Sequence, residues 1–134
     1  MEALAAELTD EDRRLFEDRN FGHFVTLLPD GRPHSMPVWV DLEDGLVLVN
    51  TIPWRAKARN VRRDPRVAIS VHDHAEPERA ISVLGTVVDQ TDDGAREHID
   101  KLSWKYRGRA WDRPQEERVL LKIRPERILR EGYG

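Results

Sequence analysis

The chain has 134 residues, of which 35% are charged and 39% apolar, with a net charge of -3, values typical of a single well-solvated domain that we expect to span residues 1–134. The slight acidic excess argues against a general nucleic-acid binder, and the lack of cysteine excludes disulfides, thiolate metal sites and cysteine nucleophiles. Because the sequence has neither a signal-peptide core nor an apolar run of about 20 residues, we expect a cytoplasmic protein without a membrane partner.

The first half of the chain predicts one helix and three strands. Thr9 can cap a helix that begins in an acidic turn and ends near Asn20. Apolar runs separated by short turns predict strands at 21–28, 33–42 and 46–51. In the second of these strands, Met36, Val38 and Val40 are expected on one side. Because the connections are short, we expect the three strands to form an antiparallel meander.

The second half predicts two helices and three strands. These elements are expected at about 55–63, 66–71, 79–90, 91–107 and 118–129. Pro65 stops the first helix, Gly85 marks a bulge, Gly108 ends the second helix and Pro125 breaks the last strand. Six or so strands without a βαβ rhythm indicate a mainly β fold with flanking helices, an antiparallel barrel or roll.

A strand that leads directly into a basic helix is the most informative segment. The strand ends at a proline-containing turn, and the segment from Arg55 to Arg66 then carries six basic residues and one acidic residue. Free N–H groups at a helix start carry partial positive charge and can bind a phosphate. Arg55 and Lys57 lie where they can close on such a group, so the sequence predicts an anion site. For Arg62 and Arg63 we favour a solvated helix face.

Several short motifs occur in a fixed order along the chain. They are Pro37-Val38-Trp39, Asn50-Thr51, the run Arg55-x-Lys57-x-x-Asn60-x-x-x-Asp64-Pro65-x-Val67, and the later strand with Gly85. Together they resemble the split-barrel flavin-binding family of pyridoxamine phosphate oxidase, and within it the branch that uses the deazaflavin coenzyme F-420. The resemblance covers nearly the whole domain, from about Phe21 to Ile128.

This resemblance implies an antiparallel split β-barrel of the FMN-binding type that forms a homodimer, with two cofactor sites in grooves between the protomers. By the family's pattern, the cofactor phosphate is held by Arg55 and Lys57, with Arg59 and Asn60 as further candidates. The residues that would line the tricyclic ring are Pro37, Val38, Trp39, Asn50 and Thr51. The ending Glu131-Gly132-Tyr133-Gly134 lacks the substrate-phosphate residues of the longer flavin oxidases, which argues against pyridoxamine phosphate oxidation itself.

Aromatic side chains are the next candidates for a site. Trp39 and Trp54 flank the expected cofactor position, where an indole can stack on a flat ligand or simply pack in the core. Trp104, Tyr106 and Trp111 can border a substrate opening, but we favour packing against the second long helix for these three.

The histidines give no clear site in the sequence. His72 and His74 form a conceivable metal pair with Asp73, but no third spaced ligand follows, so no metal site is expected. His98 is isolated in the sequence, and no Gly-x-Ser-x-Gly motif supports a hydrolase. We therefore assign no catalytic side chain, because a reduced deazaflavin carries the hydride itself and a proton can come from solvent.

The sequence and the resemblance together favour an oxidoreductase. In this hypothesis, reduced coenzyme F-420 transfers a hydride to a small conjugated acceptor such as an enone, a quinone or a tetrapyrrole-like compound. One alternative is an FMN-dependent oxidase or reductase of the same fold. Another is a non-catalytic module that binds a flavin or a tetrapyrrole. Nucleic-acid binding by the arginine-rich helix is disfavoured by the net charge of -3.

Overall fold

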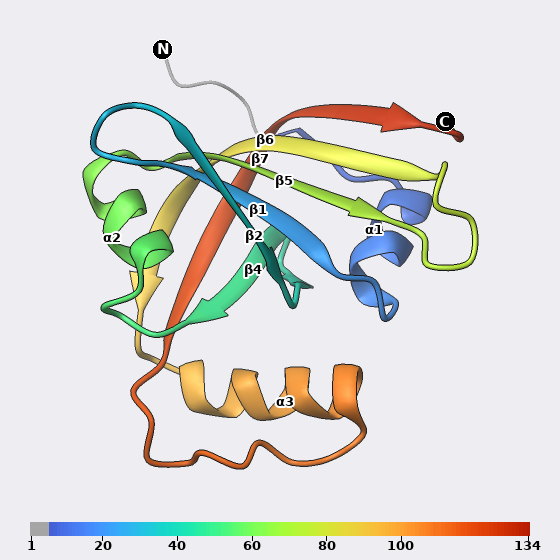
Figure 1. Ribbon diagram of the computed structural model, residues 1–134. Coiled ribbons are helices and arrows are strands. Elements are labelled where there is room, and N and C mark those ends of the chain that lie inside the picture. The colour runs from blue at the N-terminus through green and yellow to red at the C-terminus, as the bar shows by residue number, and fades with distance from the viewer. Residues whose placement is uncertain (1–5) are drawn as a thin grey trace.

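The computed structural model describes residues 6–134, which form one seven-stranded antiparallel sheet and three helices (Figure 1). The helices are α1 (Asp10–Glu17), α2 (Ala56–Arg63) and α3 (Ala95–Arg107). The strands are β1 (Gly22–Leu27), β2 (Pro33–Val38), β3 (Asp41–Glu43), β4 (Leu46–Thr51), β5 (Arg66–His72), β6 (Ala80–Thr91) and β7 (Val119–Glu131). The expected mainly β, antiparallel architecture is confirmed, with seven strands in place of six or so.

Two hairpins lie at opposite edges of the sheet, whose strand order is β2-β1-β5-β6-β7-β4-β3. β1 pairs with β2 and β3 pairs with β4, both antiparallel. The chain passes from one edge to the other through Trp39 and Val40, between the end of β2 and the start of β3. The sheet therefore curves around its core without closing into a complete barrel, which is the split arrangement (Figure 1).

Two expectations for the first half of the chain are wrong. Residues 33–42 do not form one strand, because Val40 bonds to α3: its N–H donates to the Tyr106 hydroxyl at 3.1 Å, and its carbonyl accepts from Lys105 Nζ at 2.8 Å. β2 and β3 consequently belong to separate hairpins and not to one meander. Met36 lies opposite buried Phe24 and so shares the face of Val38 on β2 as expected, although it is 42% exposed, whereas Val40 lies outside this strand.

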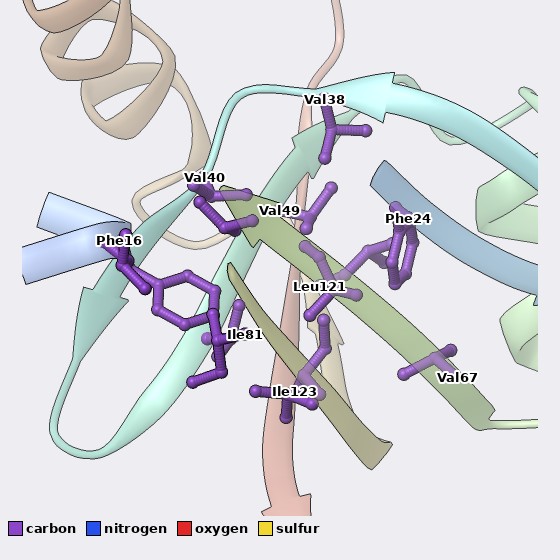
Figure 2. Packing of buried hydrophobic residues seen from close by; sticks show 14 of the residues in the cluster. Phe16, Phe24, Val38, Val40, Val49, Val67, Ile81, Leu121 and Ile123 are labelled. Carbon is purple, nitrogen blue, oxygen red and sulfur yellow. The ribbon is translucent and has the colours of Figure 1, made fainter. Parts of the chain in front are cut away.

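The core fills the concave side of the curved sheet. Figure 2 shows Phe24, Val67, Ile81 and Leu121 directed toward one another from different strands, with Phe16 of α1 entering from one end. The alternating burial of β5 confirms the period-two pattern of its sequence. Each fully buried aliphatic side chain of this kind contributes roughly 1.5–3 kcal/mol to folding.

Gly85 marks the expected irregularity in β6, where the pairing with β7 shifts register. A side chain at this position would collide with the carbonyl oxygen of Arg124, so glycine is required. The expected break at Pro125 is wrong, since β7 runs without interruption over 13 residues. Pro125 lies opposite Gly85 at the register shift, and β4 pairs with β7 only as far as Ile123, so the missing N–H does not interrupt the sheet.

Helix α1 begins as expected and is tied to the last strand. The Thr9 hydroxyl accepts from the Asp12 N–H, and the Asp12 carboxylate accepts from the Thr9 N–H, which forms a capping box. The same carboxylate, fully buried, accepts two hydrogen bonds from Arg130 and one from the Tyr133 hydroxyl. The helix ends at Glu17, earlier than expected, because the following residue takes an extended backbone conformation.

Helix α3 lies below the sheet and packs near β4 and β7 (Figure 1). It begins at Ala95 and not at residue 91, because Thr91 still pairs with β7 as the last residue of β6. It ends at Gly108 as expected, where a left-handed φ of 68° favours glycine. Within residues 6–134, no helix has the length and apolar character needed to cross a bilayer.

Candidate functional site

A cleft of about 450 Å³ opens where the sheet is split. Its walls come from the link between β2 and β3, from β4, from the start of α2, from α3, and from the segment that joins α3 to β7. Of the nine residues expected to bind the cofactor, those that line this cleft are Pro37, Val38, Trp39, Asn50, Arg55 and Lys57. The split in the sheet thus brings together segments that lie far apart in the sequence.

Stacked aromatic rings form one wall of the cleft. The rings of Trp39 and Tyr106 lie 5.3 Å apart and only 7° from parallel, and Phe21 stacks on the other side of Tyr106. Trp111 meets Trp39 edge-on at 6.1 Å. The Tyr106 hydroxyl donates to the carbonyl of Asn20 at 2.6 Å, which fixes the stack in place. Phe21, Trp39 and Trp111 line the cleft while buried Tyr106 supports them, so this wall offers aromatic surface of the kind that packs against a planar ligand.

Two cations at the start of α2, Arg55 and Lys57, also line the cleft and form its cationic corner. Arg55 is the N-cap residue of α2, which has no side-chain cap and no acidic residue in its first turn. None of the carboxylates in residues 6–134 forms an ion pair with Arg55 or Lys57. Burial lowers the pKa of Lys57, and the nearby charges of Arg55 and Arg118 lower it further. An anion placed here would relieve this repulsion.

Arg118 is a third cation of the cleft, and the sequence analysis did not identify it. Only 8% of it is exposed. Its Nε donates to Asn50 Oδ1 at 2.8 Å, its Nη1 donates to Glu116 at 2.6 Å, and its guanidinium lies over the Trp111 ring at 5.2 Å. No motif marks this residue, since it is brought to the cleft by the irregular segment after α3, which sequence periodicity does not describe.

Arg107 was not predicted as part of the site, and for Trp111 packing against the helix was favoured over a place at a substrate opening, yet both residues line the cleft. The Arg107 guanidinium lies over Trp39 at 5.4 Å and over Trp111 at 5.1 Å, so it joins the two indoles. The backbone N–H of Trp111 donates to the Asp100 carboxylate at 2.9 Å. These contacts tie the irregular segment to α3 and hold it over the cleft.

Asn50 connects the cleft to a buried polar chain. Its Oδ1 accepts from Arg118, and its Nδ2 donates to the Ala95 carbonyl at 2.8 Å and lies 3.2 Å from His98 Nδ1. His98 Nε2 in turn lies 3.1 Å from Asp41 Oδ2. With Asn50 as donor, His98 accepts at Nδ1 and donates at Nε2. The sequence indicated an isolated His98, but in the structure His98 belongs to this hydrogen-bond network.

The carboxylate of Asp41 ends this chain. Burial would raise the pKa of Asp41, but hydrogen bonds from His98, Lys101 and the Leu42 N–H outweigh it and hold the pKa well below its usual range. The Asp41 side chain is thus an anion that orients the His98 ring.

Three predicted binding residues lie outside the cleft. Thr51 is 1% exposed in the sheet beside Asn50. The Asn60 amide donates to the Thr26 hydroxyl at 2.9 Å in the protein interior. The Arg59 guanidinium donates to the backbone carbonyl of Trp54, a residue that is itself 58% exposed. Their contacts in this structure are with the protein itself.

The histidines at the end of β5 are placed away from the cleft lining. The His72 ring lies 6.2 Å from that of His23, and the His74 N–H donates to the Asn20 side chain. In the part of the chain that the structure describes, no three histidine, aspartate or glutamate residues form a group able to hold a metal ion.

The split antiparallel sheet, with an aromatic and cationic cleft at the split, defines a protein of the flavin-related split-barrel class. The family model of pyridoxamine 5'-phosphate oxidase matches residues 8–130, and the chain belongs to this family. No curated protein matches the chain.

Solved structures agree with this assignment. An F-420 reductase is 29% identical, with a TM-score of 0.82 over 91% of this chain and 98% of its own. A conserved hypothetical protein of Mycobacterium tuberculosis is 24% identical, with a TM-score of 0.76 over 95% of this chain and 86% of its own. A putative pyridoxamine 5'-phosphate oxidase of Listeria innocua is 20% identical, with a TM-score of 0.67 over 90% and 95% of the two chains. The last two share the fold.

Proposed function

We propose that the protein is an oxidoreductase that uses reduced coenzyme F-420 to transfer a hydride to a small conjugated acceptor. The observation that carries the proposal is the cleft itself, which is lined both by the Trp39 ring and by Arg55 and Lys57, two cations that pair with no carboxylate of residues 6–134. The family is one of flavin-related oxidoreductases, and the similarity to an F-420 reductase at 29% identity supports the deazaflavin over other cofactors of the family.

The residues present fit a planar cofactor with an anionic tail. Lys57 is half-buried and its pKa is lowered by burial and by the neighbouring cations, an arrangement that is unfavourable until an anion binds. Trp39, Ile99 and Leu102 offer apolar surface of the type that packs against a tricyclic ring. The planar ring and the anionic tail of such a cofactor would therefore both find matching side chains in one cleft.

The side chains of the cleft bind and orient, and the redox chemistry belongs to the cofactor. Reduced deazaflavin supplies a hydride when bound. Arg55 and Lys57 would hold the anionic tail, while Pro37, Val38 and Trp39 would fix one face of the ring so that an acceptor reaches the other. We assign no side chain to proton transfer, because the cleft is open to water, which can supply the proton.

We further propose that the active form is a homodimer. The cleft lies beside β2, an edge strand of the sheet. Phe21, which lines the cleft, and Trp54, which precedes Arg55 in the sequence, each expose more than half of their surface. A second copy of the chain packed over this face would cover the exposed rings and complete the walls of the site.

Fluorescence titration tests the cofactor assignment. Purified protein should bind coenzyme F-420 more tightly than FMN, and Lys57→Met should weaken binding by about 10- to 100-fold, as expected for a lost charge-assisted contact. Arg62→Met is the matched control, since Arg62 lies on the same helix and donates to the Pro53 carbonyl outside the cleft lining. Tight FMN binding without affinity for the deazaflavin would reject the proposal.

FMN is the second candidate, because the family is that of pyridoxamine 5'-phosphate oxidase. The titration separates the two cofactors, and a panel of enones, quinones and tetrapyrroles then tests turnover. Binding without reduction of any acceptor would instead favour a non-catalytic carrier.

A further inference from the structure

We propose that Arg118 is a third cation of the anion-binding corner, acting with Arg55 and Lys57, and that Asn50 is the positioning residue that holds its guanidinium there. The inference rests on the proposed function in one respect, namely that the anion is the charged group of the cofactor. It assigns Asn50 a role different from the direct contact with the ring that the family resemblance implies.

Hydrogen bonds hold the Arg118 guanidinium in place and leave one of its nitrogens for a ligand. Two of its three nitrogens have partners, Nε on Asn50 and Nη1 on Glu116. Nη2 has no hydrogen-bond partner among the described residues, although it is not sealed from solvent. A guanidinium that is fixed through two nitrogens and stacked on Trp111 can offer the third to a ligand without losing further side-chain entropy.

The charge of Arg118 also favours an anion in the cleft, which Arg118 lines together with Arg55 and Lys57. Burial lowers the pKa of Lys57, and the charges of Arg55 and Arg118 lower it further. Burial likewise lowers the pKa of Arg118, an effect that Glu116 offsets in part and the charge of Arg55 strengthens. Glu116 is the carboxylate that pairs with Arg118, and it leaves the other two cations uncompensated. A phosphate can accept from all three side chains, since it has several strong acceptor oxygens.

The hydrogen bonds of Asn50 support a positioning role for this residue. All of its side-chain hydrogen-bonding groups are used within the protein, since Oδ1 accepts from Arg118 and the two Nδ2 hydrogens are taken by Ala95 and His98. The two acceptors on Nδ2 set the orientation of the amide, so that its oxygen faces Arg118. Asn50 therefore has no free donor for a ring atom and acts through Arg118.

Titration with inorganic phosphate, followed by NMR, tests the proposal without a cofactor. Arg118→Met keeps the length of the side chain and should weaken phosphate binding by about 10-fold or more. Arg127→Met is the matched control, because this exposed arginine on β7 has the same charge and does not line the cleft. Equal affinity of the Arg118→Met and Arg127→Met proteins would overturn the assignment of the third cation.

Two further variants separate positioning from a merely structural role. Glu116→Gln retains an oxygen for Arg118 but removes an opposing charge, so phosphate binding should strengthen about threefold, whereas structural damage would weaken it. Asn50→Leu should weaken binding, and adding it to Arg118→Met should cause no further loss. Additive losses in the double variant, or weaker binding by Glu116→Gln, would contradict the proposal.

The same variants titrated with coenzyme F-420 keep the two proposals distinguishable. If phosphate binding depends on Arg118 while the deazaflavin does not bind, the proposed function alone fails. If the deazaflavin binds and Arg118→Met leaves both affinities unchanged, the third cation alone fails.

Discussion

Replacement of Asp12 by asparagine should destabilise the protein without affecting its cofactor site. The buried Asp12 carboxylate accepts from Arg130 at 2.6 and 2.9 Å, from Tyr133 at 2.6 Å and from the Thr9 N–H at 2.9 Å. It thereby joins α1 to the end of β7, outside the lining of the cleft. Asp12→Asn keeps the shape of the side chain but removes the charge that pairs with Arg130.

The expected loss can be estimated from the titration of the Asp12 carboxyl. Burial alone would raise its pKa, but the hydrogen bonds from Arg130, Tyr133 and Thr9 lower it from 3.8 to about 2. This difference corresponds to about 2 to 3 kcal/mol of stability at neutral pH. For a chain of this size, that loss lowers Tm by about 8 °C.

The sign of the pH dependence follows from the lowered pKa. Because the folded protein binds the proton less readily than the unfolded chain, the contribution of Asp12 is complete above pH 3.8 and is lost as the pH falls toward 2. Asp12→Asn should therefore lose most stability at neutral pH and little at the acid end of this window.

Urea unfolding at a series of pH values measures this effect. Asp10→Asn is the control, because Asp10 is exposed and, among residues 6–134, pairs only with Arg13 of the same helix. If Asp12→Asn lowers the free energy of unfolding by less than about 0.5 kcal/mol at neutral pH, Asp12 contributes no more than an exposed ion pair. That result would refute the role of Asp12 in joining α1 to β7. Weakened cofactor binding by Asp12→Asn would refute the separation between this contact and the cleft.

Three other measurements test particular contacts. Binding of phosphate should raise the pKa of Lys57, seen by NMR of methyl-labelled lysines, and an unchanged pKa would place the anion elsewhere. Gly85→Ala should destabilise the protein by about 2–4 kcal/mol in urea unfolding, because the new Cβ meets the Arg124 carbonyl and the Ile123 side chain; a neutral result would contradict this contact. Burial lowers the pKa of Lys105 from 10.5 to about 8, so the folded protein binds this proton less readily than the unfolded chain does. The free energy of unfolding should therefore rise with pH across this interval in the native protein and not in Lys105→Met. Equal slopes of stability against pH in the two proteins would show that Lys105 is not responsible.

Local sequence patterns were sufficient to predict the elements that depend on nearby residues. Thr9 begins α1 through a capping box with a residue three positions away, and Gly108 ends α3 through its own left-handed backbone. The irregularity at Gly85 was also predicted from the glycine itself, although the reason for it is a distant contact, since a side chain there would meet the Arg124 carbonyl on β7. The strand and turn that lead into α2 likewise placed Arg55 and Lys57 together at the start of a helix, and both residues line the cleft.

Features that depend on distant contacts could not be predicted in this way. The break between β2 and β3 arises because Val40 bonds to Tyr106 and Lys105, more than sixty residues further along the chain. Arg118 reaches the cleft only because the segment after α3 folds back over it, and His98 gains its partners only when α3 lies beside β4. Contacts between residues so far apart in the chain cannot be predicted from hydrophobic periodicity or motif spacing in the sequence.

The most direct test of the central claim is a crystal structure of the protein with bound coenzyme F-420. We expect the phosphate within hydrogen-bonding distance of Lys57 and Arg55, with the ring in the cleft beside Trp39. A deazaflavin bound elsewhere, with no anionic group near Arg55 and Lys57, would contradict the account.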